Sequence, residues 1–249
     1  MKFTGKAALI TGGSRGIGAA IARRLAGEGA AVAVNYLSRR EAADALVAEI
    51  TAAGGKAIAL QGDVGAAATG PELVRRTVEA FGRLDLLVNN AGIAVHGLVA
   101  DVAVEQWVGG IATNLFGTFY CSKAALPQLR QNRGVILNIS SINSQICDPT
   151  ISSYSASKAA IEAFTKSLGK EEARNGVRVV CIAPGPTRTE MQIGGWTDEQ
   201  IQRLEKLIPL QRIGDPDEIA KAASFLLSDE ASFITAVTLT VSGGLTGNR

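Results

Sequence analysis

Near the start of the chain stands Thr11-Gly12-Gly13-Ser14-Arg15-Gly16-Ile17-Gly18, directly after the apolar run Ala7–Thr11 and directly before a helical pattern. Glycines at a strand-to-helix turn allow a sharp bend and let a pyrophosphate approach the free N–H groups of the helix N-terminus. The spacing differs from the standard Gly-x-Gly-x-x-Gly, and a glycine cluster alone is also compatible with a plain tight turn. Its place after the first predicted strand favours a dinucleotide-binding loop.

Outward from this loop, short apolar runs alternate with longer amphipathic segments, the order that builds a parallel sheet covered on both faces. The predicted strands are Ala7–Thr11, Ala31–Asn35, Ala57–Gln61, Leu84–Asn89, Val135–Ser140, Val177–Ile182 and Val237–Val241. The predicted helices are Gly16–Gly29, Arg40–Ala53, Pro71–Phe81, Val104–Arg130, Ser155–Asn175 and Pro216–Leu227. We therefore expect an α/β fold, a Rossmann-like doubly wound sheet of seven parallel strands with helices on both faces.

No linker composition interrupts the 249 residues, so one domain spanning 1–249 is predicted. One segment breaks the alternation of strands and helices. After Pro184 the chain is rich in proline and glycine, and a short helical pattern follows at Asp198–Leu207. Long loops inside compact domains are usually functional, so a substrate lid is expected at about 186–209.

Composition narrows the possible partners. Apolar residues make up 47% and charged residues 19% of the chain, which excludes a mainly disordered state, and the net charge of +2 without a basic run argues against nucleic acid. No apolar run suits a membrane span or a signal peptide, so a cytoplasmic location is expected. The three cysteines, Cys121, Cys147 and Cys181, are read as small buried residues. With a single histidine and no Cys-x-x-Cys pair, no metal site is predicted.

The end of the second predicted strand bears on the cofactor. The stretch Asn35-Tyr36-Leu37-Ser38-Arg39-Arg40 holds no carboxylate, whereas an acidic residue near this position would mark NAD. Arg15, Ser38 and Arg39 could instead donate hydrogen bonds to an adenosine 2′-phosphate. NADP(H) is therefore predicted over NAD(H). The alternative is that Arg39 and Arg40 form a solvated helix start.

Tyr154 and Lys158 stand four residues apart at the start of a predicted helix and therefore share one face. A free tyrosine titrates near ~10, and a nearby cation lowers that pKa by favouring the phenolate. Alone, such a pair is also compatible with an ordinary surface. However, Ser140-Ser141 and Asn89–Gly92 end two predicted strands at the edge where open α/β sheets bind ligands.

Taken together, these motifs resemble the short-chain dehydrogenase/reductase family. The residues that carry the resemblance, in family order and spacing across nearly the whole chain, are Thr11–Gly18, Asp63-Val64, Asn89–Gly92, Asn114, Ser141, Tyr154, Lys158 and Pro184-Gly185.

The resemblance implies a role for each matching residue. Tyr154 would be the general acid in carbonyl reduction and the base in the reverse direction. Ser141 would hold the substrate oxygen, with neighbouring Ser140 as the alternative. Lys158 would bind the nicotinamide ribose and lower the pKa of the tyrosine. Asn114 would hold a water that links Lys158 to solvent.

The resemblance also implies cofactor contacts. Asp63 would bind the adenine amino group with Val64 beside it, and Asn90, Ala91 and Gly92 would line the adenosine ribose. The segment Pro184, Gly185, Thr187 and Thr189 would fix the carboxamide and the phosphates. The remaining predicted cofactor-binding residues are Gly12, Ser14, Arg15, Gly16, Ile17, Gly18, Asn35, Ser38, Arg39, Tyr154 and Lys158.

The expected activity is NADPH-dependent reduction of a ketone, reversible as secondary-alcohol oxidation, with the substrate left open. An alternative is a 3-oxoacyl-acyl-carrier-protein reductase, although the family's carrier-docking arginines fall on Asn132 and Asn175, with Arg133 and Arg174 each displaced by one. A remote alternative is a non-catalytic NADP(H)-binding scaffold. The retained tyrosine and lysine disfavour it.

The substrate wall and the assembly are also predicted. The mostly apolar wall would comprise Ala94, Val95, His96, Ser144–Cys147, Met191, Ile193 and Trp196, although a lone loop histidine such as His96 is more often exposed to solvent. By resemblance, a homotetramer is expected through the two long helices, which carry apolar residues such as Phe116 and Phe119 beyond one stripe. Those residues are also compatible with core positions.

Overall fold

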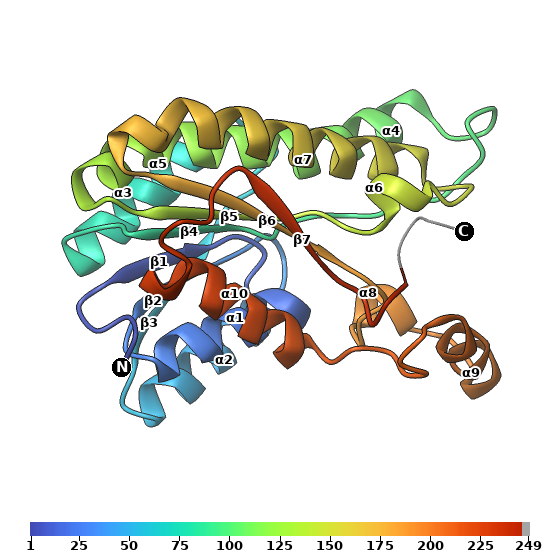
Figure 1. Ribbon diagram of the computed structural model, residues 1–249, viewed down its shortest axis with the longest axis horizontal. Helices are drawn as coiled ribbons and strands as arrows, with labels where there is room; N and C mark the ends of the chain where they lie inside the picture. Colours follow the sequence, from blue (N-terminus) through green and yellow to red (C-terminus); the bar gives the residue numbers. More distant parts are fainter. Residues whose placement is uncertain (246–249) are drawn as a thin grey trace.

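The computed structural model describes residues 1–245 and contains a parallel sheet in the order β3-β2-β1-β4-β5-β6-β7 (Figure 1). Every neighbouring pair of strands is parallel. The strands are β1 Ala7–Ile10, β2 Ala31–Tyr36, β3 Lys56–Gln61, β4 Leu86–Asn89, β5 Val135–Ile139, β6 Arg178–Pro184 and β7 Val237–Val241. The predicted doubly wound sheet of seven strands is confirmed.

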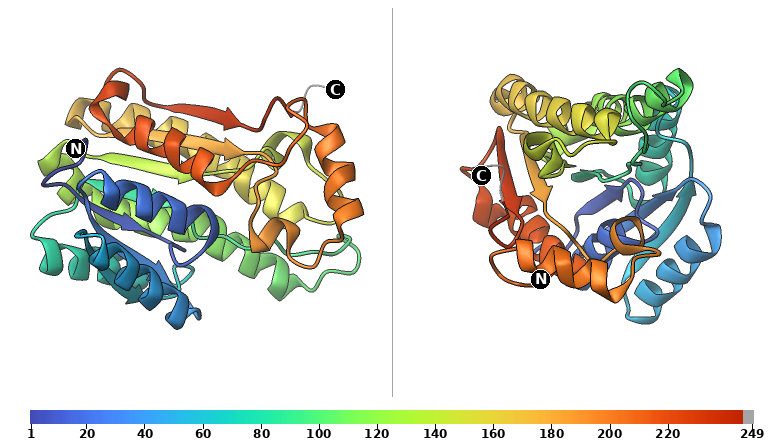
Figure 2. Two further views of the ribbon diagram at one scale, coloured as in Figure 1. Left: turned by 90° about the horizontal axis from the view of Figure 1, so that it is seen from below. Right: turned by 90° about the vertical axis from the view of Figure 1, so that its right-hand side faces the viewer.

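Helices cover both faces of the sheet (Figures 1 and 2). One face carries α1 (Gly16–Gly27), α2 (Arg40–Ala52) and α10 (Pro216–Leu227), and the other carries α3 (Thr69–Phe81), α5 (Gly117–Asn132) and α7 (Ser152–Glu172). Successive strand side chains point to opposite faces, so Ala8 and Ile10 of β1 join the first core and Leu9 joins the second. This explains why the strands read as continuous apolar runs.

The strand order reverses between β1 and β4. From β1 the chain proceeds outward to β2 and β3 and then returns to β4 on the other side of β1. The loops after β1 and β4 therefore meet, and the N–H groups of Asn90 and Ala91 donate to Thr11 Oγ1 at 3.0 and 3.1 Å. In open α/β sheets such a reversal is where ligands bind, beyond the carboxyl ends of the strands.

The long helix predicted over 104–130 is divided in the structure. It consists of α4 (Val104–Ile111), a π-helical turn (Ala112–Phe116) and α5, and Asn114 lies inside the π-helical turn. The helix predicted to begin at Ser155 begins at Ser152 instead, and a 3₁₀ turn (Ala173–Asn175) ends it. Tyr154 thus lies within the first turn of α7.

Short helices gather beyond the carboxyl ends of the strands (Figures 1 and 2). They are α6 (Asn143–Ile146), α8 (Glu190–Ile193) and α9 (Asp198–Leu207). The latter two form the segment predicted as a substrate lid, and its lid function stays a prediction. A 3₁₀ turn (Asp229–Ala231) precedes β7.

Two of the three cysteines are buried. The prediction of buried cysteines holds for Cys121 and Cys181 and is wrong for Cys147, which is exposed because it follows α6 at the surface. No helix within residues 1–245 combines the length and apolarity needed to cross a membrane.

Candidate active site

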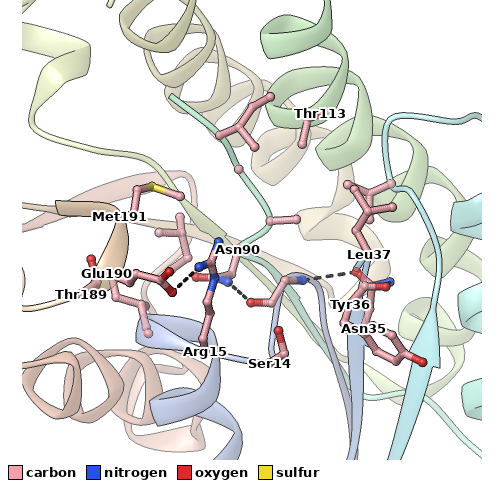
Figure 3. A pocket seen from close by; sticks show the side chains of 18 of the residues that line it. Ser14, Arg15, Asn35, Tyr36, Leu37, Asn90, Thr113, Thr189, Glu190 and Met191 are labelled. Carbon is pink, nitrogen blue, oxygen red and sulfur yellow. Dashed lines mark hydrogen bonds and ion pairs between the residues drawn. The ribbon is translucent and has the colours of Figure 1, made fainter. Parts of the chain in front are cut away.

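A cleft of about 330 Å³ lies beyond the carboxyl ends of the central strands (Figure 3). It brings together nearly all the predicted site residues. Those that line it are Gly12, Ser14, Arg15, Gly16, Ile17, Asn35, Ser38, Arg39, Asp63, Val64, Asn90, Ala91, Gly92, Ser141, Tyr154, Lys158, Pro184, Gly185, Thr187 and Thr189. Gly18 and Asn114 are the two predicted residues behind the lining.

Gly18 leaves no room for a side chain beneath the glycine-rich loop. A Cβ built on Gly18 would lie 2.5 Å from both Asn90 Nδ2 and the Gly12 carbonyl oxygen. That amide of Asn90 donates to the Gly12 carbonyl oxygen at 2.9 Å (Figure 3) and to the Thr11 carbonyl oxygen at 3.0 Å. The glycine therefore allows the loop and the end of β4 to close on each other, which gives the loop a fixed position at the cleft.

Asn35 braces the same loop from β2. Its Oδ1 accepts from Gly12 N at 3.2 Å, and its Nδ2 donates to the carbonyl oxygens of Leu60 at 3.2 Å and Gly62 at 3.0 Å. The side chain is buried and bonded to backbone on both sides. Asn35 thus positions the loop and also lines the cleft, and its predicted contact with a cofactor stays a prediction.

The sequence left two interpretations of the arginines at the start of α2 open: contact with a 2′-phosphate or a solvated helix start. Each interpretation fits one of the two arginines. Arg40 is exposed and pairs with Asp44 within α2, as a solvated helix start does. Arg39 instead faces the cleft, where its Nη2 lies 3.2 Å from Glu190 Oε1. Arg15 pairs with the other carboxylate oxygen of Glu190 (Figure 3). Glu190 was not predicted, because its partners come from segments far away in the sequence.

At the adenine end, Asp63 Oδ1 accepts from Gly65 N at 2.9 Å, which fixes the carboxylate of Asp63 at the cleft wall. Val64 is buried, and a Cβ on Gly117 would lie 2.8 Å from its Cγ2. The helix α5 thus holds this part of the wall in place. Both positions suit the adenine contacts implied by the resemblance.

The reactive side chains come from the end of β5 and the first turns of α7. Ser141 follows β5, and Tyr154 and Lys158 stand one turn apart on α7. Lys158 Nζ donates to the Ile139 carbonyl oxygen at 2.8 Å and lies 5.4 Å from the centroid of the Tyr154 ring. The Ser141 hydroxyl accepts from Asn143 N at 3.2 Å, which orients it within the cleft.

Burial governs the proton affinities of these groups. Burial raises the pKa of Tyr154 above its usual value, and the Ser141 hydroxyl opposes that rise only in part. Burial lowers the pKa of Lys158 to about 8. The Lys158 ammonium donates to the Ile139 carbonyl oxygen, and the lowering of the tyrosine pKa expected from Lys158 stays a prediction.

Asn114 stands directly behind the cleft wall. Its Oδ1 accepts from Ile93 N at 2.8 Å, and its Nδ2 donates to the Ile93 carbonyl oxygen at 3.0 Å and to Ser157 Oγ at 2.9 Å. A Cβ on Gly92 would lie 3.3 Å from Asn114 Oδ1 and 3.5 Å from Lys158 Nζ. The side chain thus fixes the loop after β4, and the expected role of Asn114 in holding a relay water stays a prediction.

The two serines after β5 have different surroundings. The Ser140 hydroxyl lies 3.0 Å from both the Lys158 carbonyl oxygen and Glu162 Oε1, and Ser144 Oγ donates to the same Glu162 oxygen. Glu162 was not predicted, and it ties the serine segment to α7. Ser140 is thereby engaged in the scaffold, which leaves Ser141 as the hydroxyl beside Tyr154.

Most of the residues predicted for the substrate wall do not line the cleft. Of its candidates, Met191 lines the cleft, while His96 is exposed and outside the lining. The wall includes other residues that the sequence did not single out, namely Tyr36, Leu37, Gly62, Ile93, Thr113, Ile139, Glu190 and Gln192. Most follow strand ends or lid turns, where side-chain direction depends on tertiary packing.

Comparisons with known proteins agree with this geometry. A family model described as Enoyl-(Acyl carrier protein) reductase matches residues 12–246. A 3-oxoacyl-[acyl-carrier-protein] reductase of Synechocystis sp. is 43% identical over 98% of both chains, and glucose 1-dehydrogenase 2 of Bacillus subtilis is 41% identical over 98% of this chain and 96% of that one. A short chain dehydrogenase from Burkholderia cenocepacia, solved in complex with NADP, superposes with a TM-score of 0.92 at 37% identity, covering 98% of this chain and 99% of that chain.

Proposed function

Because this chain belongs to the short-chain dehydrogenase/reductase family, we propose that it reduces a ketone with NADPH and catalyses the reverse oxidation of a secondary alcohol. As a family member it is an oxidoreductase acting on carbonyl or hydroxyl groups. The observation that carries the proposal is the position of Tyr154 beside Ser141 and Lys158 at the wall of the cleft, with the glycine-rich loop at its other end.

The chain's own residues supply orientation and the proton. A bound nicotinamide would supply the hydride that adds to the carbonyl carbon. The Ser141 hydroxyl orients the substrate oxygen, and the Tyr154 hydroxyl transfers its proton to that oxygen as negative charge develops there. The resulting phenolate is stabilised by the nearby Lys158 ammonium, and its reprotonation completes the cycle. In the oxidation direction the phenolate accepts the alcohol proton.

The residues around the glycine-rich loop support NADP(H) as the cofactor. Arg15 and Arg39 place two guanidinium groups at the rim of the cleft, with the Ser38 hydroxyl beside them in the lining. The end of β2 offers no carboxylate to repel a 2′-phosphate. The similar Burkholderia protein was solved with NADP.

A second candidate, reduction of a 3-oxoacyl group on acyl carrier protein, is favoured by the names of several relatives. Overall identity does not decide the substrate, since a glucose dehydrogenase is nearly as similar. At the expected docking positions, Asn132 donates to the Leu84 carbonyl oxygen, whereas Arg133 and Arg174 are exposed. These two arginines are the cationic groups that an acidic carrier would contact.

One experiment separates these activities. The rate of NADPH oxidation is measured with ethyl acetoacetate, with acetoacetyl-acyl carrier protein and with a broad carbonyl panel, each repeated with NADH. The proposal predicts turnover of the free keto ester and a preference for NADPH. Turnover confined to the carrier-bound substrate would establish the second candidate. Tight NADPH binding without turnover of any carbonyl would establish the scaffold alternative.

We further propose a homotetramer that works in the cytoplasm. The surface of the long helices supports the assembly, because Phe116 and Phe119 are 43% and 42% exposed. Phe119 also packs edge-on against Phe164 of α7, so the two helices share one aromatic surface. Large apolar side chains gathered on one face are typical of protein interfaces.

A further inference from the structure

Glu190 lies across the rim of the cleft between Arg15 and Arg39, which come from distant segments, and Figure 3 shows its pair with Arg15. It is the first residue of α8, whereas Arg15 comes from the glycine-rich loop and Arg39 directly precedes α2. One carboxylate oxygen pairs with each guanidinium group. All three side chains are roughly half exposed, so a ligand entering the cleft can reach them.

The carboxylate is held in its charged form. The Arg15 guanidinium, with a further contribution from Arg39, holds the pKa of Glu190 below its usual range. The same two guanidinium groups are those that the proposed cofactor preference assigns to an adenosine 2′-phosphate. A phosphate carries about −1.5 to −2 charges and three acceptor oxygens, so it pairs with two arginines more strongly than one carboxylate does.

We propose that Glu190 is a specificity-determining residue: its carboxylate occupies the Arg15–Arg39 pair and yields it to a cofactor that carries a 2′-phosphate. This inference rests on the proposed use of NADP(H). Binding of NADPH then includes the loss of both Glu190 ion pairs. NADH has no group at the 2′ position that competes for the arginines, and it leaves those pairs in place.

Competition between the Glu190 carboxylate and a 2′-phosphate for the two arginines also couples cofactor binding to the predicted lid. Glu190 belongs to the segment 186–209, and its two ion pairs tie α8 to the glycine-rich loop and to the start of α2. The cap of α8 is independent of the arginines, because Thr189 Oγ1 accepts from Gln192 N at 3.3 Å. Displacing Glu190 therefore releases α8 from both segments without removing its cap.

The test compares the affinities of the two cofactors. Dissociation constants for NADPH and NADH are measured by fluorescence titration of the full chain and of the Glu190→Gln variant. Loss of two exposed ion pairs corresponds to roughly a 3- to 10-fold tighter binding of NADPH. The affinity for NADH is expected to stay within about 2-fold, and this retained binding also shows that the variant is folded.

A matched control is Glu199→Gln, which removes the same charge from the lid. Glu199 pairs with Arg203 inside α9 and has no contact with either cleft arginine. It is expected to change neither affinity. Equal tightening by Glu190→Gln and Glu199→Gln, or equal tightening of NADPH and NADH, would overturn the inference, because either result reflects net charge alone. An unchanged NADPH affinity in Glu190→Gln would overturn it as well.

Two adenosine fragments distinguish this inference from the proposed cofactor preference. The unmodified chain should bind 2′,5′-ADP more tightly than 5′-AMP, and Glu190→Gln should widen that difference. Equal binding of the fragments to the unmodified chain would overturn both the preference for NADP(H) and the role of Glu190. A clear preference for 2′,5′-ADP that Glu190→Gln leaves unchanged would overturn the role of Glu190 alone.

Discussion

Lys158 is a cationic residue buried at the wall of the cleft. Its side chain is 3% exposed, and its Nζ donates to the Ile139 carbonyl oxygen. Burial lowers its pKa to about 8, so the ammonium is easily deprotonated for a lysine while remaining mostly charged at neutral pH. Near Tyr154 such a group can both stabilise a phenolate and take part in restoring its proton.

This burial predicts a pH-dependent stability. The folded pKa of Lys158 is lowered from 10.5 to about 8, so the cost of burying the charged form is fully present below pH 8. Between these two values the unfolded chain binds the proton and the folded chain does not, so stability rises with pH. The gain from about pH 7 to about pH 10 is roughly 2 to 3 kcal/mol.

Urea unfolding of the unmodified chain and of Lys158→Met at both pH values checks this expectation. The comparison cancels the titration of other groups. The free energy of unfolding should rise more with pH in the unmodified chain than in the variant. Parallel changes in the two proteins would show that Lys158 keeps an ordinary pKa.

At the scale of elements, the strand-to-helix turn after β1 positions the site through backbone packing. The loop is held by Asn35 from β2 and Asn90 from the end of β4, and Gly18 of α1 lies against both Asn90 and the loop. A single added methyl group at this point has to move backbone rather than a flexible side chain. The cofactor end of the cleft is therefore expected to be sensitive to small changes in α1.

Gly18→Ala is expected to weaken NADPH binding by at least about 10-fold, because the new Cβ would lie 2.5 Å from the Gly12 carbonyl oxygen and displace the loop. The matched control is Gly27→Ala at the other end of α1, where a Cβ meets nothing within 4 Å. Alanine is also the better helix former. Equal affinity of the two variants for NADPH, measured by fluorescence titration, would contradict this role of Gly18.

The buried hydrogen bonds of Asn114, which lies in the π-helical turn, are expected to stabilise the fold. Asn114→Ala would leave the N–H and carbonyl of Ile93 and the Ser157 hydroxyl without their buried partner. The expected loss is about 2 to 4 kcal/mol of unfolding free energy, measured in urea. Gln131→Ala, at an exposed position of α5, should cost no more than about 0.5 kcal/mol. Similar losses in the two variants would contradict the bracing role of Asn114.

The sequence predicts the elements well and the long-range contacts poorly. Apolar runs placed every strand to within two residues, because burial on both faces leaves a local signal. The π-helical turn was missed, since one extra residue in a helix leaves no periodic mark. Glu190 was missed because its pairing with Arg15 and Arg39 depends on how the lid folds over the cleft, and Ile93 entered the wall through a loop whose direction is set by Asn114.

For the molecule as a whole, exposed aromatic side chains on α5 and next to it indicate how copies of the chain would assemble. Phe119 lies on α5, whose opposite side is packed into the second core through Cys121, Ala125 and Leu129, and Phe116 ends the π-helical turn directly before α5. The exposure of Phe116 and Phe119 therefore adds apolar surface outside the core. In the proposed homotetramer a second copy of the chain would cover it.

Light scattering is expected to give about four times the 25.8 kDa of one chain. Phe119→Asp places a charge in the proposed interface and should shift the mass to a smaller species. Val99→Asp, at a loop residue that is 73% exposed, serves as the control and should leave the mass unchanged. A monomer in the unmodified chain would contradict the proposed assembly.

The most direct test of the proposed reaction is the rate of NADPH oxidation by Tyr154→Phe with ethyl acetoacetate. Loss of the phenol proton donor predicts a fall in kcat of at least about 100-fold with the Kd for NADPH nearly unchanged. Tyr120→Phe removes a hydroxyl from an aromatic cluster on α5 and should keep the normal rate. A near-normal rate in Tyr154→Phe would contradict the assignment of Tyr154 as the acid.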